Sequence, residues 1–112
     1  MAFQSTLEMS NNVAKITLVG ELDASVAAQF KSSIDEAATK QAKRIALLAN
    51  GLEYISSAGL RVLVFARQKL GAGIDIYLIG AQSQIIEPIK QSGLLHSLRT
   101  SETYDASVIE VF

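Results

Sequence analysis

A short apolar run without polar alternation, RIALLA at residues 44–49, lies between two stretches in which apolar residues recur with helical spacing. An uninterrupted run of this length is typical of a strand covered on both faces, as in a parallel sheet flanked by helices. Parallel strands need crossover connections, which are usually helices. The run therefore predicts an α/β fold in which residues 44–49 lie centrally in the sheet.

The other predicted strands lie on either side of this run in the chain. Residues 13–19, VAKITLV, alternate between an apolar and a polar face, and residues 3–9 are expected to pair beside them across a turn at residues 10–12. Residues 73–80, GIDIYLIG, alternate in the same way, and residues 94–98 are expected to form a last short strand. A sheet of about four to five strands follows from this pattern.

The first predicted helix follows the strand at residues 13–19. Asp23 or Ser25 is expected as its N-cap, and the helix should run to about Lys40. Its buried positions keep helical spacing and are Val26, Phe30, Ile34 and Ala37.

A turn is expected around Asn50 and Gly51, and a second helix follows it. Gly71 or Gly73 should end this helix, because glycine readily adopts the left-handed conformation that closes many helices. The buried side of the helix is predicted from the spacing of Leu60, Leu63, Val64 and Leu70.

A third helix is predicted over residues 84–92, with Gly93 closing it. Pro88 must lie in its first turn or kink it, since proline has no backbone N–H. Residues 103–112, TYDASVIEVF, have the pattern of a short amphipathic helix. Strands and helices thus alternate without a repeat or linker, as in a single α/β sheet with crossover helices.

The composition fits one soluble domain that spans residues 1–112. The 112 residues are 49% hydrophobic, which is within the usual size of a single core. Ten basic and eleven acidic residues leave a formal net charge of -1, so we expect no binding to nucleic acid or anionic lipid. The amino terminus has no signal-peptide pattern and no apolar segment is long enough to span a bilayer, so a cytoplasmic protein without membrane insertion is expected.

The chain has no cysteine and a single histidine, His96. This leaves no thiolate nucleophile and little material for a metal centre or a Ser/His catalytic pair. The carboxylates of Glu8, Glu21 and Asp35 do not cluster as in an acid/base site. We therefore expect no enzyme activity, no metal and no cofactor, and a His96 that lies on the surface or is partly packed.

Ser56 and Ser57 stand at the start of the second predicted helix. Either hydroxyl would stabilise the helix as an N-cap by about 1 kcal/mol. A hydrolase nucleophile would need a G-x-S-x-G turn, and ISSAG lacks the first glycine. A phosphoacceptor needs only an exposed hydroxyl beside free backbone N–H groups, which tolerate the added charge. Ser57 meets these needs in the sequence.

Three segments, VGELDASVAAQF, LEYISSAGLRVL and QSGLLHSL, occur in this order across nearly the whole chain. They resemble the STAS domain of bacterial anti-sigma factor antagonists, also called anti-anti-sigma factors. The resemblance implies a single STAS-like domain with a mixed, mostly parallel sheet and helices packed mainly on one face. It also implies a non-enzymatic regulator of transcription that works by partner switching.

In this family the unphosphorylated domain binds a GHKL-type serine kinase that is also an anti-sigma factor, and a sigma factor is thereby released. The kinase then phosphorylates the antagonist, which ends the complex, and a PP2C-type phosphatase removes the phosphate. The family motif is Asp, two Ser or Thr residues and then Gly-Leu, with the phosphate on the residue after the Asp. It matches Gly59 and Leu60, and it implies Ser57 as the acceptor with Ser56 as the alternative.

Two positions depart from the family pattern. Ser56 stands where the motif has Asp, and Leu48 or Ala49 replaces an acidic or amide residue often found near the end of the preceding strand. If those groups orient the acceptor, phosphorylation would be slow, shifted to Ser56 or lost. The alternative hypothesis is a constitutive STAS subunit that binds an ABC-transporter ATPase or a sensory complex. A small enzyme or nucleotide-binding domain is a third hypothesis, but the chain has no P-loop and no G-x-G-x-x-G.

The residues expected to bind a partner surround the acceptor and are Asp23, Tyr54, Ser56, Ser57, Gly59 and Arg61. Asp23 is expected on the loop that enters the first helix, at the same edge of the sheet as Ser57. Arg61 and Arg67 are expected on the solvated side of the second helix, where they would form charged contacts with a partner. No apolar stripe is left over once the helices cover the sheet, so the free protein is expected to be a monomer.

Overall fold

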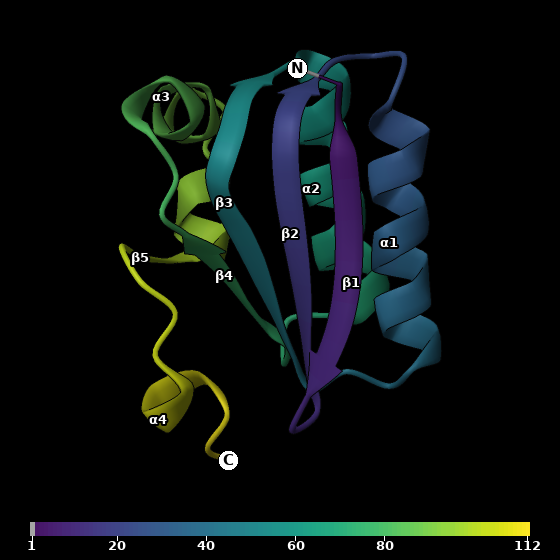
Figure 1. Cartoon of the computed structure of the whole chain (residues 1–112), viewed down its shortest axis with the longest axis vertical. Helices are drawn as coiled ribbons and strands as arrows, with labels where there is room; N and C mark the ends of the chain where they lie inside the picture. Colours follow the sequence, from purple (N-terminus) through teal and green to yellow (C-terminus); the bar gives the residue numbers. More distant parts are fainter. Residues whose placement is uncertain (1) are drawn as a thin grey trace.

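Five strands form one sheet in the order β1-β2-β3-β4-β5 in the computed structural model (Figure 1). β1 (Gln4–Ser10) is antiparallel to β2 (Val13–Leu22). β3 (Arg44–Ile55), β4 (Asp75–Ile79) and β5 (Arg99–Ser101) continue the sheet parallel to β2. The predicted mixed, mostly parallel sheet is confirmed, and β3 is its central strand.

The hairpin between β1 and β2 turns over Asn11 and Asn12, whose φ angles are 47° and 67°. Two consecutive left-handed residues form the turn whose twist matches that of a hairpin, and asparagine adopts this conformation more readily than most residues. The turn places Ser10 opposite Val13 and so fixes the register of the two strands. The predicted pairing of the first two strands is confirmed.

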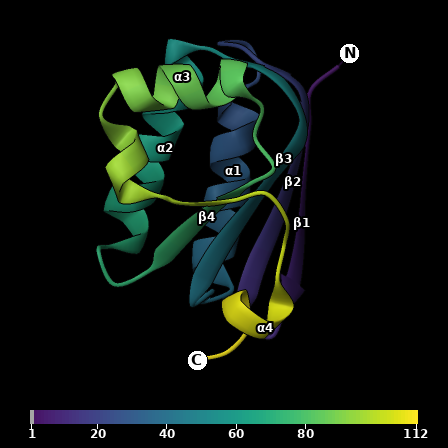
Figure 2. The same ribbon diagram turned by 90° about the vertical axis from the view of Figure 1, so that its left-hand side faces the viewer.

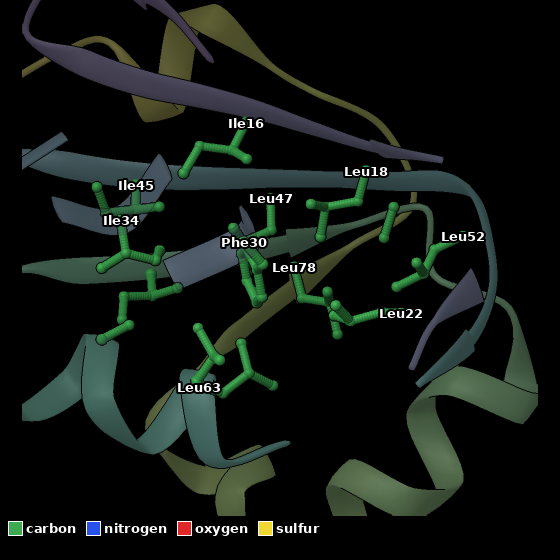
Figure 3. Packing of buried hydrophobic residues seen from close by; sticks show 14 of the residues in the cluster. Ile16, Leu18, Leu22, Phe30, Ile34, Ile45, Leu47, Leu52, Leu63 and Leu78 are labelled. Atoms are coloured by element: carbon green, nitrogen blue, oxygen red, sulfur yellow. The ribbon is translucent and has the colours of Figure 1, made fainter. Parts of the chain in front are cut away.

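Three helices cover one face of the sheet: α1 (Ala27–Thr39), α2 (Ser57–Leu70) and α3 (Ser83–Gln91) (Figure 2). Alternate residues of the strands point toward these helices and form the main core with them. Each large side chain buried there contributes about 1.5–3 kcal/mol to folding. The labelled core residues in Figure 3 are Ile16, Leu18, Leu22, Phe30, Ile34, Ile45, Leu47, Leu52, Leu63 and Leu78.

The C-terminal segment covers part of the opposite face of the sheet. α4 (Ala106–Ile109) places Ile109 against Val13, Ala46 and Ile79, which form a second buried cluster with it. Because Ala46 lies in the apolar run, β3 is buried on both faces there. The prediction made from residues 44–49 is confirmed.

Polar contacts hold the C-terminal segment in place. Arg44 donates hydrogen bonds of 2.8–3.1 Å to three backbone carbonyls on and after α4. The carboxylate of Glu110 accepts from the Tyr104 hydroxyl at 2.6 Å, the Asn11 amide at 2.6 Å and the Ser10 hydroxyl at 3.2 Å. These bonds, chiefly the one from Tyr104, lower the pKa of Glu110, while burial and Glu110 together raise the pKa of Tyr104.

β3 runs through Asn50 and Gly51, so the turn predicted there is wrong. The strand absorbs these residues in an irregular stretch of its pairing with β2. From Thr17 to Val19, β2 advances by two residues, while β3 advances by three, from Leu48 to Gly51. The extra residue of β3 makes a bulge, which bends a strand locally without ending it.

Residues 94–98 do not form the predicted strand. They contain a 3₁₀ helix, η1 (Leu94–Ser97), which follows Gly93 with a left-handed φ of 82°. A short apolar run cannot distinguish a strand from a buried helical turn, and β5 follows it as three exposed polar residues. Pro88 lies inside α3 beyond its first turn, so the first of its two expected alternatives is wrong and the kink stays a prediction.

The structure describes residues 2–112, and none of the helices within them combines the length and apolar character needed to cross a bilayer. The longest of these helices, α2, has 14 residues. A membrane-spanning helix needs about 20.

Candidate functional site

The carboxyl ends of β2 and β3 meet at one edge of the sheet, where α2 begins. Leu22 and Ile55 are the last paired residues of the two strands. The Ser56 amide extends this pairing by donating to the Leu22 carbonyl oxygen at 2.9 Å. Asp23 and Ser57 follow directly in the chain, so both lie at this edge of the sheet.

Ser56 is the N-cap of α2, as the sequence predicts for one of the two serines. Its backbone is extended, with φ −87° and ψ 171°, and its Oγ accepts a hydrogen bond from the Gly59 amide at 3.2 Å. Its carbonyl oxygen accepts from the Leu60 amide at 3.0 Å. The Ser56 hydroxyl therefore already has a structural partner.

Ser57 is the first residue of α2, and its side chain is exposed. The amides of a first helical turn point toward the helix start, and the helix dipole adds partial positive charge there. A phosphate on Ser57 Oγ would lie close to these groups. Of the two serines, Ser57 is the one whose hydroxyl is accessible to a modifying enzyme.

Gly59 lets α2 pack closely against the ends of β2 and β3. A Cβ atom at this position would lie 2.8 Å from Leu22 Cγ and 2.9 Å from Ile55 Cγ1. Favourable carbon–carbon contacts are about 3.5–4.0 Å long. Gly59 is itself buried, so it positions the start of α2 rather than offering a surface to a partner.

Neither Asp23 nor Ser25 is the N-cap of α1, which corrects the sequence expectation. The helix begins at Ala27, and its N-cap residue Val26 makes no side-chain hydrogen bond. The Asp23 carboxylate instead accepts from the Ser25 amide at 2.9 Å and the Ser25 hydroxyl at 2.6 Å. The hydroxyl bond from Ser25 is the main cause that lowers the pKa of Asp23. An exposed, ionised carboxylate is thus fixed in the loop at this edge.

α2 presents one exposed face that begins at Ser57. Ser57, Arg61 and Val64 follow each other at helical spacings of four and three residues, and all three side chains are exposed. Tyr54, three residues before the helix, is 48% exposed. Val64 was predicted to be buried and is 37% exposed, because Val62 and Leu63 fill the packed side instead. The helical spacing from Ser57 is visible in the sequence. The apolar character of Val64, however, predicts a buried side chain.

Arg67 does not lie on this exposed face, which corrects its expected solvation. Its guanidinium donates to the carbonyl oxygens of Gly71 at 3.0 Å, Ile74 at 2.6 Å and Ser97. These bonds join the end of α2 to β4 and η1. Gly71 closes the helix with a φ of 85°, as one of the two predicted glycines.

The arrangement around Ser57 suits binding and modification. His96 is exposed and lies with Arg67 at the other end of α2, so no imidazole reaches Ser57 to act as its base. In the part of the chain that the structure describes, no three His, Asp or Glu side chains are grouped to hold a metal ion. The exposed features near this edge are the Ser57 hydroxyl, the Asp23 carboxylate, Arg61 and the side chains of Tyr54 and Val64.

The family model of the STAS domain matches residues 4–107, which include all five strands and helices α1 to α3. The chain belongs to the STAS domain family. The resemblance carried by the three sequence segments is thereby confirmed.

Relatives of this STAS domain include the anti-sigma-F factor antagonist RsfB of Mycobacterium tuberculosis (strain ATCC 25618 / H37Rv). The two are 26% identical over 98 residues, which are 88% of this chain and 80% of RsfB. A crystal structure of an anti-sigma factor antagonist from Mycobacterium paratuberculosis has a TM-score of 0.87 and 19% identity, covering 98% of this chain and 96% of that one.

The anti-sigma factor antagonist SpoIIAA is also similar. Its unphosphorylated form gives a TM-score of 0.77 at 25% identity, covering 96% of this chain and 93% of that one. The phosphorylated form of SpoIIAA from Bacillus gives a TM-score of 0.70 at the same identity, covering 96% of each chain. The fold of this chain is therefore similar to that of a protein whose structure is known both with and without phosphate.

Proposed function

We propose that this STAS domain is an anti-sigma factor antagonist that docks on a serine kinase/anti-sigma factor and is released when Ser57 is phosphorylated. The kinase is of the GHKL type, and a PP2C-type phosphatase restores the binding form. Both partners follow the family pattern, and the exchange takes place in the cytoplasm. The domain itself is the substrate and ligand of these enzymes and catalyses no reaction.

The different structural roles of two adjacent serines support this proposal. Ser56 holds the first turn of α2 through its bond to the Gly59 amide, so its hydroxyl is engaged. Ser57 is exposed at the first helical position. A kinase can therefore reach Ser57 without unfolding the cap that keeps α2 in place.

Phosphorylation changes the charge of the edge more than its shape. A phosphate adds about -1.5 to -2 charges at neutral pH. The first-turn amides of α2 tolerate that charge, while the ionised Asp23 carboxylate at the same edge adds to it. A partner packed over Ser57, Arg61 and Tyr54 must then rearrange its charged groups to match the added negative charge, or dissociate.

The test is to capture the complex of this domain with the kinase/anti-sigma candidates of its host, and to record intact mass before and after ATP. A gain of one phosphate with release of the partner is expected. Ser57→Ala should bind the partner but show neither change. Ser83→Ala is the matched control, since Ser83 is also the exposed first residue of a helix, and it should behave as wild type.

Ser56→Ala separates the two candidate acceptors. If Ser57 is the acceptor, this variant is still phosphorylated, although its helix start is weakened. A phosphate that appears in Ser57→Ala and is lost in Ser56→Ala would move the acceptor to Ser56. Mapping of the phosphate to any other residue would refute the proposed switch.

A constitutive STAS subunit is the second candidate function. It is favoured by Ser56 at the motif position of an Asp, and by Leu48, which packs against the Ile109 cluster on the sheet face opposite α2. In this case the same edge binds an ABC-transporter ATPase or a sensory complex permanently. Stable capture of such a partner, with no mass change in the presence of ATP and kinase, would support this function over the first.

A further inference from the structure

A pocket lies at the end of α2 opposite Ser57. Its volume is about 360 Å³, within the range of small-molecule sites. The end of α2, the start of β4, η1 and the start of β5 form its walls. The lining residues that carry the argument are Arg67, Ala72, Asp75, His96, Leu98 and Arg99.

The charges of the pocket favour an anion. Two guanidinium groups and one imidazole face a single carboxylate, that of Asp75. This carboxylate is already paired, because Arg99 Nε lies 3.3 Å from it and Arg44 Nε lies 3.9 Å from it. The pairing leaves an excess of positive charge, since Arg67 has only neutral carbonyl oxygens as its hydrogen-bond partners.

The two arginines differ in mobility. The three carbonyl bonds of Arg67 fix its guanidinium in the pocket wall, so its charge is in place before any ligand arrives. The Arg99 side chain is 63% exposed at the rim, and its planar fork of donors matches a carboxylate or a phosphate. Ala72, which is exposed, and Leu98, which is partly exposed, add apolar surface to the same pocket.

We propose that this pocket binds a small organic anion, with its carboxylate or phosphate group on Arg99 and His96 and its apolar part against Ala72 and Leu98. Arg67 lies ten residues beyond Ser57 on α2, which corresponds to about 15 Å. The anion and a partner at Ser57 therefore occupy separate sites.

The test is a titration of the ¹⁵N-labelled protein with phenyl phosphate, benzoate and phenol at constant ionic strength, followed by NMR. Saturable shifts of the Ile76, Ser97 and Leu98 amides are expected with at least one of the two anions and not with phenol. The anion that binds identifies the chemistry of the headgroup. Arg99→Gln should weaken binding at least tenfold, and Arg61→Gln, an exposed arginine on the other half of α2, should leave it unchanged.

Three results would overturn the proposal: no saturation with either anion up to millimolar concentration, equal shifts with phenol, or equal weakening by Arg61→Gln and Arg99→Gln. Arg99 is exposed, so its substitution is expected to keep the fold, and far-ultraviolet circular dichroism checks this. None of these outcomes depends on phosphorylation of Ser57. The pocket and the proposed switch can thus fail independently.

Discussion

Replacing Gly59 with alanine is expected to destabilise the protein by about 1–2 kcal/mol. The new Cβ would lie 2.8 Å from Leu22 Cγ and 2.9 Å from Ile55 Cγ1, so these two side chains or the helix α2 must shift. Overpacking of this kind costs about 1–3 kcal/mol. The higher helix propensity of alanine returns at most about 1 kcal/mol, since Gly59 is only the third residue of α2, so a mid-range cost of about 2 kcal/mol falls to about 1–2 kcal/mol.

Urea unfolding followed by far-ultraviolet circular dichroism measures this change, and the melting temperature should fall by about 4 °C for each kcal/mol. Gly73→Ala is the matched control, because Gly73 has open space around its Cβ position and no left-handed φ. Its effect should be neutral or stabilising by less than about 1 kcal/mol. A Gly59→Ala protein as stable as wild type would refute the claim that close packing of α2 on Leu22 and Ile55 requires glycine.

Ser56→Ala should lower the free energy of unfolding by about 1 kcal/mol, because the bond from the Gly59 amide to the Ser56 hydroxyl is lost. Ser57→Ala should change it by less than about 0.5 kcal/mol. Equal effects of the two substitutions in urea unfolding would contradict the assigned roles. Arg67→Met should lose about 1–3 kcal/mol in the same assay, because three carbonyl oxygens lose their charged donor. The lowered pKa of Glu110 means that its stabilisation is present above the ordinary glutamate pKa and is lost as pH falls through the folded value. Wild type should therefore lose more stability between pH 7 and about pH 3 than Glu110→Gln does, and parallel pH profiles would argue against the Tyr104–Glu110 contact.

The strands were predictable from the sequence where a single pattern determined them. Residues 13–19 alternate because one side faces the helices, and residues 44–49 do not alternate because Ala46 is covered by α4 as well. The Asn50-Gly51 pair wrongly predicts a turn, because a turn signal reflects only the local sequence. The pairing of β3 with β2 depends on residues far apart in the chain, and it continues past this pair through a bulge.

The candidate site was predictable at the level of residue type and less so at the level of contacts. Ser56 as cap followed from capping preferences alone. Arg67 could not be placed, since its three acceptors include Ser97, thirty residues away in the chain. The sequence pattern predicts Val64 in the core, because nothing local marks an apolar helix residue as exposed.

The order of the strands in the sheet is also their order in the chain, so each new strand adds to the same growing edge. During synthesis, the β1–β2 hairpin can form first, and each later helix and strand can join it as it emerges from the ribosome. The second buried cluster cannot form in this stepwise way, because Val13, Ala46 and Ile79 are covered by Ile109. Three apolar side chains of the sheet therefore stay open to water, or to a chaperone, until Ile109 has been made and covers them.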